Sequence, residues 1–144
     1  MITKTVKFII CSLCILLTFS SCTLFNEVKQ EAERVAVFTE EFVTLVEEPT
    51  VEKAQELVHP KSNLTAESVI EKIQNNEKLA DLDLTQEVTI GEVSDLKLLH
   101  QDAELGGNVY SVDCQVIVGG VVIDVSLTLL STEEGLGLYD FDIK

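Results

Sequence analysis

From residue 28 onward, apolar side chains recur at steps of three and four, which is the spacing of an amphipathic helix. The stripe consists of Val28, Ala32, Val35, Phe38, Phe42 and Leu45. Glutamates and an arginine cover the remaining positions. Pro49 ends the pattern, because the residue before a proline is displaced from helical backbone angles. The sequence predicts a long first helix with one face in a core.

Two shorter helices are predicted after it. Thr50 is a natural N-cap for a helix over Val51–Val58, and Thr65 can cap a third helix with Glu67 in its first turn. The apolar stripe of this third helix is Val69, Ile70 and Ile73. The polar segment 75–83 then predicts a loop or a frayed helix end.

From Glu87 the apolar period changes to two, the period of a half-buried strand. A first strand is expected over Glu87–Val93, resuming at Leu96–Leu99 after a bulge or bend, with a turn at Ala103–Asn108. Strict alternation from Tyr110 to Val118 meets Gly119-Gly120, the glycine pair that suits a two-residue hairpin turn. A return strand follows, and Leu136–Ile143 forms the last one.

The hairpin register follows from the pattern. A two-residue loop gives four apolar pairs on one face: Val118–Val121, Val116–Ile123, Cys114–Val125 and Val112–Leu127. The opposite face pairs Gln115 with Asp124 and Asp113 with Ser126. A slip by one residue would mix the two faces, so this register is strongly specified.

The last strand depends on the length of the loop before it. A five-residue loop, Ser131–Gly135, keeps Asp140 and Asp142 out of the core, where unpaired carboxylates are costly. The pairs it predicts are Tyr139–Leu127, Phe141–Val125 and Ile143–Ile123. One face of the sheet is then apolar, and the other bears Asp113, Asp124, Asp140 and Asp142.

Helices followed by an antiparallel meander indicate an α+β domain. We expect residues 28–144 to form a single domain, with three N-terminal helices packed on the apolar face of a four-stranded antiparallel sheet. The length from Cys22 to Lys144 suits one domain and is enough to bury a core.

The N-terminal segment has another layout. Lys4 and Lys7 precede the apolar run Phe8–Phe19 and the small pair Ser20-Ser21, the order of a secretory signal peptide. The run is shorter than the roughly 20 residues that a membrane span needs. The tetrad Phe19-Ser20-Ser21-Cys22 resembles a bacterial lipobox, with Phe19 where leucine is usual.

That resemblance implies cleavage before Cys22 and a diacylglycerol thioether on its sulfur, usually with an N-acyl chain such as palmitate. Residues 1–21 would be the signal peptide and 22–27 a lipidated tether, so the domain would be anchored outside the cytoplasm on the cell envelope. The sequence leaves open which membrane holds it. The alternative is an ordinary cleaved signal peptide that leaves Cys22 free.

The net charge limits the classes of partner that the chain can bind, and the cysteine count limits its disulfides. Removal of the signal lowers the basic count from 10 to 8 against 25 acids, so the formal charge moves from −15 to −17. Such a surface repels nucleic acid and anionic lipid headgroups. Cys11 and Cys14 leave with the signal, so no intramolecular disulfide is predicted once Cys22 carries lipid.

The order of elements resembles the nuclear-transport-factor-two-like cone fold, and locally its small bacterial lipoproteins. The resemblance rests on Phe42-Val43-Thr44-Leu45, on the run from Val51 to Pro60 and on the C-terminal strands. It implies a long helix and two shorter ones in the concavity of a curved sheet. Some members are isomerases or dehydratases with a pocket His, Asp or Tyr, and others are binding modules. A cystatin-like fold is the alternative.

The register assigns candidate residues to the concave face. These are Tyr110, Cys114 and Tyr139, with His59 and His100 able to reach the pocket mouth. A mid-strand thiol with apolar neighbours is typically inert, and lone histidines are more often structural than catalytic. Asp124 and Asp142, expected as cross-strand neighbours, are the candidate ligands for a cation. No cofactor is predicted.

These observations predict a lipid-anchored, non-catalytic domain that binds a partner protein or a small apolar ligand. Two alternatives remain. One is an isomerase- or dehydratase-type enzyme that uses His59 or His100 with Tyr110 or Tyr139. The other is a cation-binding envelope protein that acts through its acidic sheet face.

Overall fold

The computed structural model describes residues 22–144, with side chains from residue 27 and without that of residue 95. The predicted signal segment and the side chain of Cys22 lie outside the described residues. The elements are α2 (Cys22–Glu47), α3 (Val51–Leu57), α4 (Ala66–Gln74), α5 (Glu77–Ala80), β1 (Val88–Asp102), β2 (Gly107–Val118), β3 (Val121–Thr132) and β4 (Gly135–Ile143). The predicted α+β class with an antiparallel sheet is confirmed.

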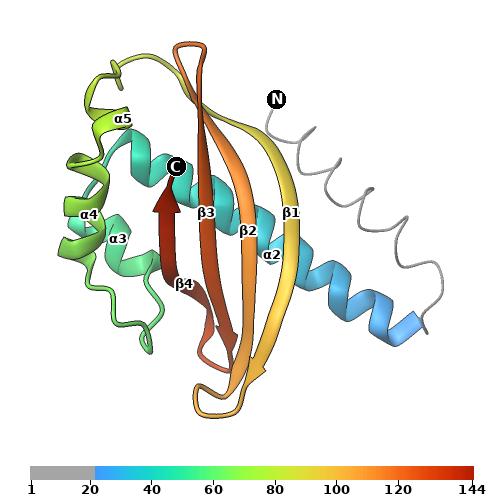
Figure 1. Cartoon of the computed structure of the whole chain (residues 1–144). Coiled ribbons are helices and arrows are strands. Elements are labelled where there is room, and N and C mark those ends of the chain that lie inside the picture. Colours follow the sequence, from blue (N-terminus) through green and yellow to red (C-terminus); the bar gives the residue numbers. More distant parts are fainter. Residues whose placement is uncertain (1–21) are drawn as a thin grey trace.

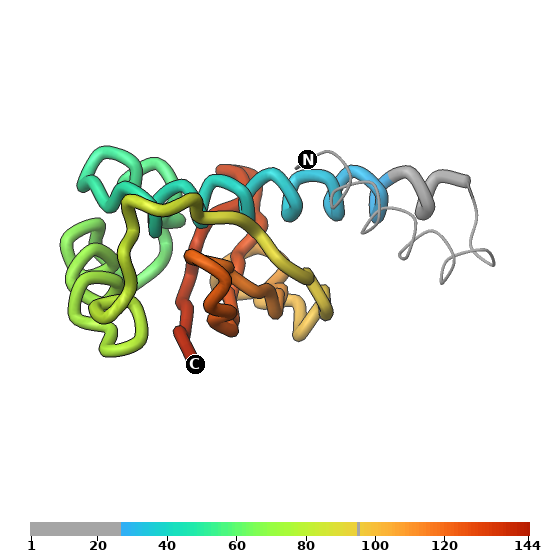
Figure 2. The backbone as a smooth tube through the Cα atoms, turned by 90° about the horizontal axis from the view of Figure 1, so that it is seen from above, coloured from blue at the N-terminus to red at the C-terminus, as the bar shows by residue number. Residues whose placement is uncertain are grey.

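The helices and the sheet form two layers. The strands follow one another in the order β1-β2-β3-β4. Helix α2 crosses one face of the sheet, and α3, α4 and α5 lie beside β4 (Figure 1). Viewed from above, the N-terminal part of α2 extends beyond the strands (Figure 2). The main apolar core therefore lies between the helices and the sheet face that α2 crosses.

Helix α2 is attached through the predicted stripe. Phe42 and Leu45 are fully buried, and Phe42 meets Phe141 of β4 edge to face, with ring centroids 5.4 Å apart. The buried hydroxyl of Thr39 donates to the Val35 carbonyl, so this polar group costs little in the core. The helix ends at Glu47, as the following proline predicts.

The helix caps are confirmed at two places. Thr50 accepts a hydrogen bond from the backbone of Lys53, and Thr65 forms a reciprocal capping box with Ser68. Helix α3 ends at Leu57, one residue earlier than predicted, because Val58 is extended and forms a parallel bridge to Leu138 of β4.

The segment predicted as a loop after α4 contains a further short helix. Asn76 accepts hydrogen bonds from the backbones of Lys78 and Leu79, which starts α5. Leu79 is buried against the core. One apolar residue in a polar segment does not predict a helix from the sequence. Packing of Leu79 against the rest of the fold stabilises this short helix.

The central hairpin matches the predicted register. Val118 pairs with Val121, Cys114 with Val125, and Asp113 with Ser126 on the other face. Gly119 and Gly120 have φ values of 55° and 83°, a region where side chains other than glycine are strained. Strand β1 runs on to Asp102, with register irregularities at three places instead of one bend.

The predicted loop before β4 is wrong. Thr132 pairs with Gly135 across a two-residue turn, and an irregularity follows between Thr128 and Leu129. Leu127 consequently faces Phe141, and Tyr139 becomes the extra residue of a bulge. The bulge restores the inward and outward alternation that a short loop alone would invert. Asp140 and Asp142 therefore still face solvent, as expected.

Candidate functional site

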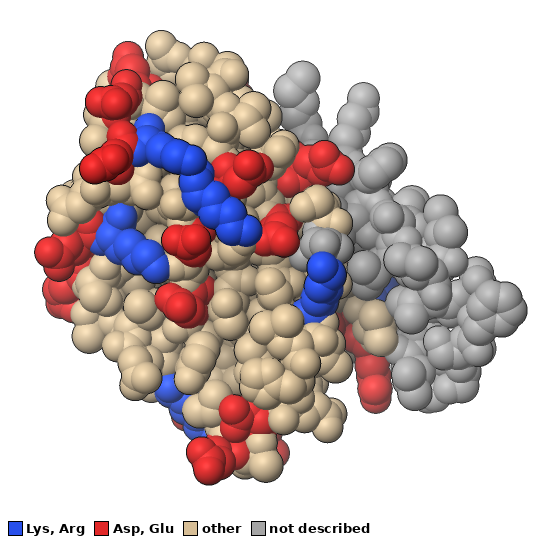
Figure 3. Space-filling view, in the orientation of Figure 1, with Lys and Arg blue, Asp and Glu red and all other residues tan. Residues whose placement is uncertain are grey.

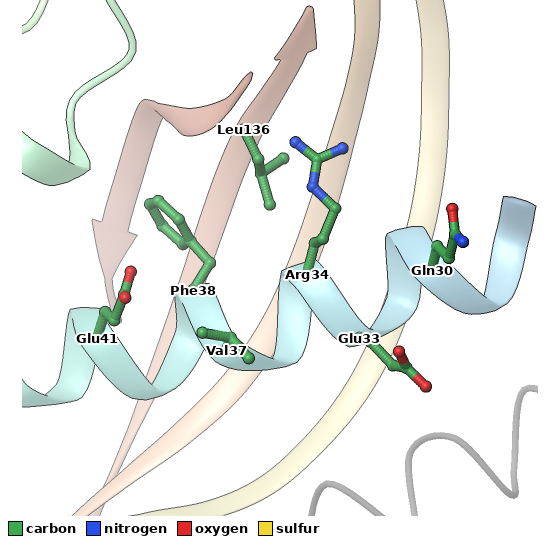
Figure 4. Close-up of a pocket in the computed structure, with 7 residues that line it drawn as sticks. All are labelled: Gln30, Glu33, Arg34, Val37, Phe38, Glu41 and Leu136. Atoms are coloured by element: carbon green, nitrogen blue, oxygen red, sulfur yellow. The ribbon is translucent and has the colours of Figure 1, made fainter. Parts of the chain in front are cut away.

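An open groove of about 500 Å³ follows one side of α2 (Figure 4). Its described lining residues are Gln30, Glu33, Arg34, Val37, Phe38 and Glu41 of α2 and Leu136 of β4. Steps of three, four and seven place the helical residues on adjoining faces of α2. In Figure 4, Arg34 and Phe38 rise from the helix toward Leu136.

The groove has an apolar floor and a polar rim. Phe38 is 5% exposed, whereas Val37 is 52% exposed, so the apolar surface that the groove offers to solvent comes mainly from Val37. Concave sites that bind other molecules combine such apolar surface with a few polar groups that fix orientation. The groove therefore combines an apolar base with charged and polar side chains at its edges.

An ion pair lies at one end of the groove. The Arg34 guanidinium donates from Nη1 to Glu31 Oε2 at 2.9 Å. The other carboxylate oxygen of Glu31 is buried and has no hydrogen-bond partner among the described residues. Burial and then the charge of Glu31 raise the pKa of Tyr110, whose hydroxyl accepts a hydrogen bond of 3.5 Å from Asn108. The ion pair offsets the positive charge of Arg34.

The five predicted pocket residues occupy different surroundings. Tyr110 is half-buried beside Glu31, and Cys114 is enclosed in the core. Tyr139 lies at the β4 bulge, where its carbonyl accepts a hydrogen bond from Ser62. His100 is exposed near the end of β1, with Nε2 3.6 Å from Asp102 Oδ2. His59 is buried against β4.

His59 fastens the connection between α3 and α4 to the sheet. Its backbone N–H donates to the Leu138 carbonyl at 2.9 Å. The N–H of Lys61 donates to Nδ1 at 3.1 Å, so Nε2 carries the hydrogen and donates to Thr132 Oγ1 at 3.0 Å. Burial lowers the pKa of His59, against the opposing charge of Glu134. Both ring nitrogens are engaged in holding structure.

The predicted pairing of Asp124 with Asp142 is wrong. Asp142 lies opposite Ser126, while the backbone of Lys144 donates to the Asp124 carbonyl. The two-residue turn before β4 and the bulge at Tyr139 each contribute one position to this displacement. Lysines and acids lie near each other on the sheet face turned away from α2 (Figure 3). No group of three or more His, Cys, Asp or Glu residues in the described part of the chain is placed to hold a metal.

Cys114 is expected to resist thiol reagents in the native state. Its side chain is 2% exposed, and burial followed by the charge of Asp113 raises its pKa to about 12, so almost no thiolate forms at pH 8. A disulfide reagent at pH 8 should react with Cys114 at least about a hundredfold more slowly in the native chain than in urea.

The same titration in urea also tests Cys22. One reactive thiol per mature chain is expected when Cys22 carries a thioether-linked lipid, and two when it is free. Fast reaction of Cys114 in the native chain would contradict its enclosure in the core.

Sequence reasoning missed the groove because it assigned Glu31 and Arg34 to the solvent-facing side of the first helix. A usable signal was present: Val37 lies outside the apolar stripe and has Glu33 and Glu41 four positions away on either side. Leu136 was expected only as the start of the last strand. Its contribution depends on how the sheet bends toward α2.

Comparisons with known proteins place no further constraint on the site. No protein-family model, no curated protein and no solved structure matches this chain. Within residues 22–144, no helix has both the length and the apolar character of a membrane span.

Proposed function

We propose that this chain is a lipid-anchored binding domain on the extracytoplasmic side of a bacterial cell envelope, and that the groove along α2 receives its partner. The observation that carries the proposal is the groove itself, with the half-exposed Val37 next to the buried Phe38 along α2. The N-terminal pattern that ends at Cys22 supports the anchor. No catalytic step is assigned.

The architecture we infer is cone-like, with α2 lying across the concave side of a curved sheet. The crossing of α2 over the strands and the bulges in β1 and β4, which bend strands, support this description. The engagement of both His59 nitrogens and the exposure of His100 favour a binding role over an isomerase or dehydratase role.

The backbone of α2 supports a short, stiff attachment. The helix begins at Cys22, and its first buried side chain in the described residues is Ala32. At 1.5 Å per residue, Gln30 lies about 12 Å along the helix from Cys22. A lipid on Cys22 would therefore hold the groove close to the bilayer surface, within reach of partners at the membrane.

Cys22→Ala should abolish the anchor. Labelling of cells with an alkyne fatty acid is expected to mark the wild-type chain and to leave the variant unmarked, because the thioether needs the Cys22 sulfur. The variant should also migrate as a larger, unprocessed precursor on a gel. Cys114→Ala is the matched control and should keep the label. Persistent labelling of the Cys22 variant would refute the anchor.

A photo-crosslinking amino acid at position 37 tests the groove. Val122 is the matched control, since both valines are 52% exposed and Val122 lies in the β2–β3 hairpin, away from the groove. We expect a discrete cross-linked band from position 37 in intact cells and none from position 122. Equal cross-linking from both positions, or none from either, would contradict a binding role for the groove.

A further inference from the structure

Three residues of α2 form a row along the groove: Glu33, Val37 and Glu41. Four-residue steps keep them on one face of the helix, and eight residues separate the two carboxylates by about 12 Å along the axis. Val37 is the only large apolar residue of α2 that is strongly exposed among the described side chains. The row therefore presents one apolar contact between two negative charges.

The charges that line the groove favour a positively charged ligand. Arg34 is the only basic lining residue described, and Glu31 already offsets it through the 2.9 Å pair. Glu33 and Glu41 form no ion pair in the described residues, so the groove is acidic. The whole chain, with 25 acids against 10 basic residues, adds a long-range field of the same sign.

We propose that the groove binds a basic amphipathic helix of a partner protein. An apolar side chain of that helix packs on Val37, Phe38 and Leu136. Lysines or arginines four positions before and four after it lie opposite Glu33 and Glu41. This inference rests on the proposed binding function and names the chemistry of the partner.

A helix fits this surface better than the other occupants. The groove follows a single helix whose side chains form ridges at four-residue spacing, and a second helix packs its own ridges against them. A second copy of this chain would bring Glu33 and Glu41 against like charges, which is unfavourable at a desolvated contact. A small apolar ligand would leave the two carboxylates unused.

The test uses a peptide as the probe. The chain has no tryptophan, so it adds no indole fluorescence to that of a 15-residue helical peptide with one Trp at its centre, and the blank corrects for the nanodisc scaffold. This peptide has Lys four positions before and after the Trp, and a matched peptide has Glu at both places. The protein is the full chain in phosphatidylcholine nanodiscs, with empty nanodiscs as the blank.

We expect the Lys peptide to show a blue-shifted, saturable signal with the protein and the Glu peptide to show none. Glu33→Gln with Glu41→Gln should weaken binding about threefold to tenfold, the sum of two exposed ion pairs. Glu67→Gln with Glu71→Gln removes the same charge from an i, i+4 pair on α4 and should change nothing. Val37→Asp should abolish binding.

Three results would overturn the inference: no saturable binding of the Lys peptide, equal binding of the two peptides, or equal effects of the α2 and α4 variants. The cross-linking experiment separates this failure from that of the proposed function. A band from position 37 without peptide binding removes the basic helix and keeps the binding role. Absence of both the cross-linked band and peptide binding removes the binding role of the groove and the basic helix together.

Discussion

Replacement of Phe42 by alanine is expected to cost about 3–5 kcal/mol of unfolding free energy, as for other buried phenylalanines. Phe42 is fully buried and meets Phe141 at 5.4 Å with an interplanar angle of 64°. Lys72 of α4 lies over the ring of Phe141, with its Nζ atom 4.4 Å from the ring centroid. The substitution therefore removes an aromatic contact between α2 and β4 and also loosens a cation–π contact.

The loss is large relative to the stability of the domain. Native domains of this size are stable by about 5–15 kcal/mol, and Cys114 is a free thiol, so no disulfide compensates within the described residues. Urea unfolding followed by circular dichroism gives the free energy. Phe42→Leu should cost much less, and Val37→Ala, at a half-exposed site, should be near neutral. A cost below about 1.5 kcal/mol for Phe42→Ala would show that α2 is held elsewhere.

The central hairpin was predictable from the sequence because two independent signals agree. The alternation from Val112 to Val118 fixes which side chains face inward, and Gly119-Gly120 fixes the turn length. A slip would have buried Asp113 and Asp124. The C-terminal end of the long helix was predictable for the same reason, since its apolar stripe stops just before the proline that ends it.

The position of β4 was not predictable by the same reasoning. Counting loop residues assumes regular pairing. The two-residue turn moves the partners by one relative to the prediction, and the bulge at Tyr139 moves every later partner by one more. No residue in the sequence marks this bulge. The sequence did indicate that Asp140 and Asp142 must face solvent, and the chain meets that requirement by another route.

The burial of His59 was hidden for a related reason. It depends on Gly137 of β4, where an added Cβ would lie 2.7 Å from the His59 Cα atom. Only glycine lets the segment after α3 lie this close to the strand. The two residues are far apart in the chain, and nothing in the local pattern of either one indicates the other.

His59→Ala is expected to destabilise the domain by about 2–4 kcal/mol, because it removes a buried side chain together with its hydrogen bonds to the Lys61 N–H and the Thr132 hydroxyl. His100→Ala is the matched control. This second histidine is exposed, with 56% of its side chain accessible, and its removal should be near neutral. Urea unfolding at pH 7.5 distinguishes the two, and equal effects would contradict the assigned role of His59.

The stability should also depend on pH through His59. Burial lowers the pKa of His59 in the folded state below its ordinary value of 6.5, so the unfolded chain binds more protons. Glu134 opposes this shift and Lys61 adds to it. The contribution of His59 is complete above pH 6.5 and is lost as the pH falls toward the lower folded-state pKa.

Wild-type unfolding free energy should therefore decrease between pH 7 and pH 5.5, and His59→Gln should show a flatter profile over that interval. A profile that is unchanged in this variant would mean that other groups titrate there, and that the fastening of the α3–α4 connection to β4 does not depend on a neutral imidazole.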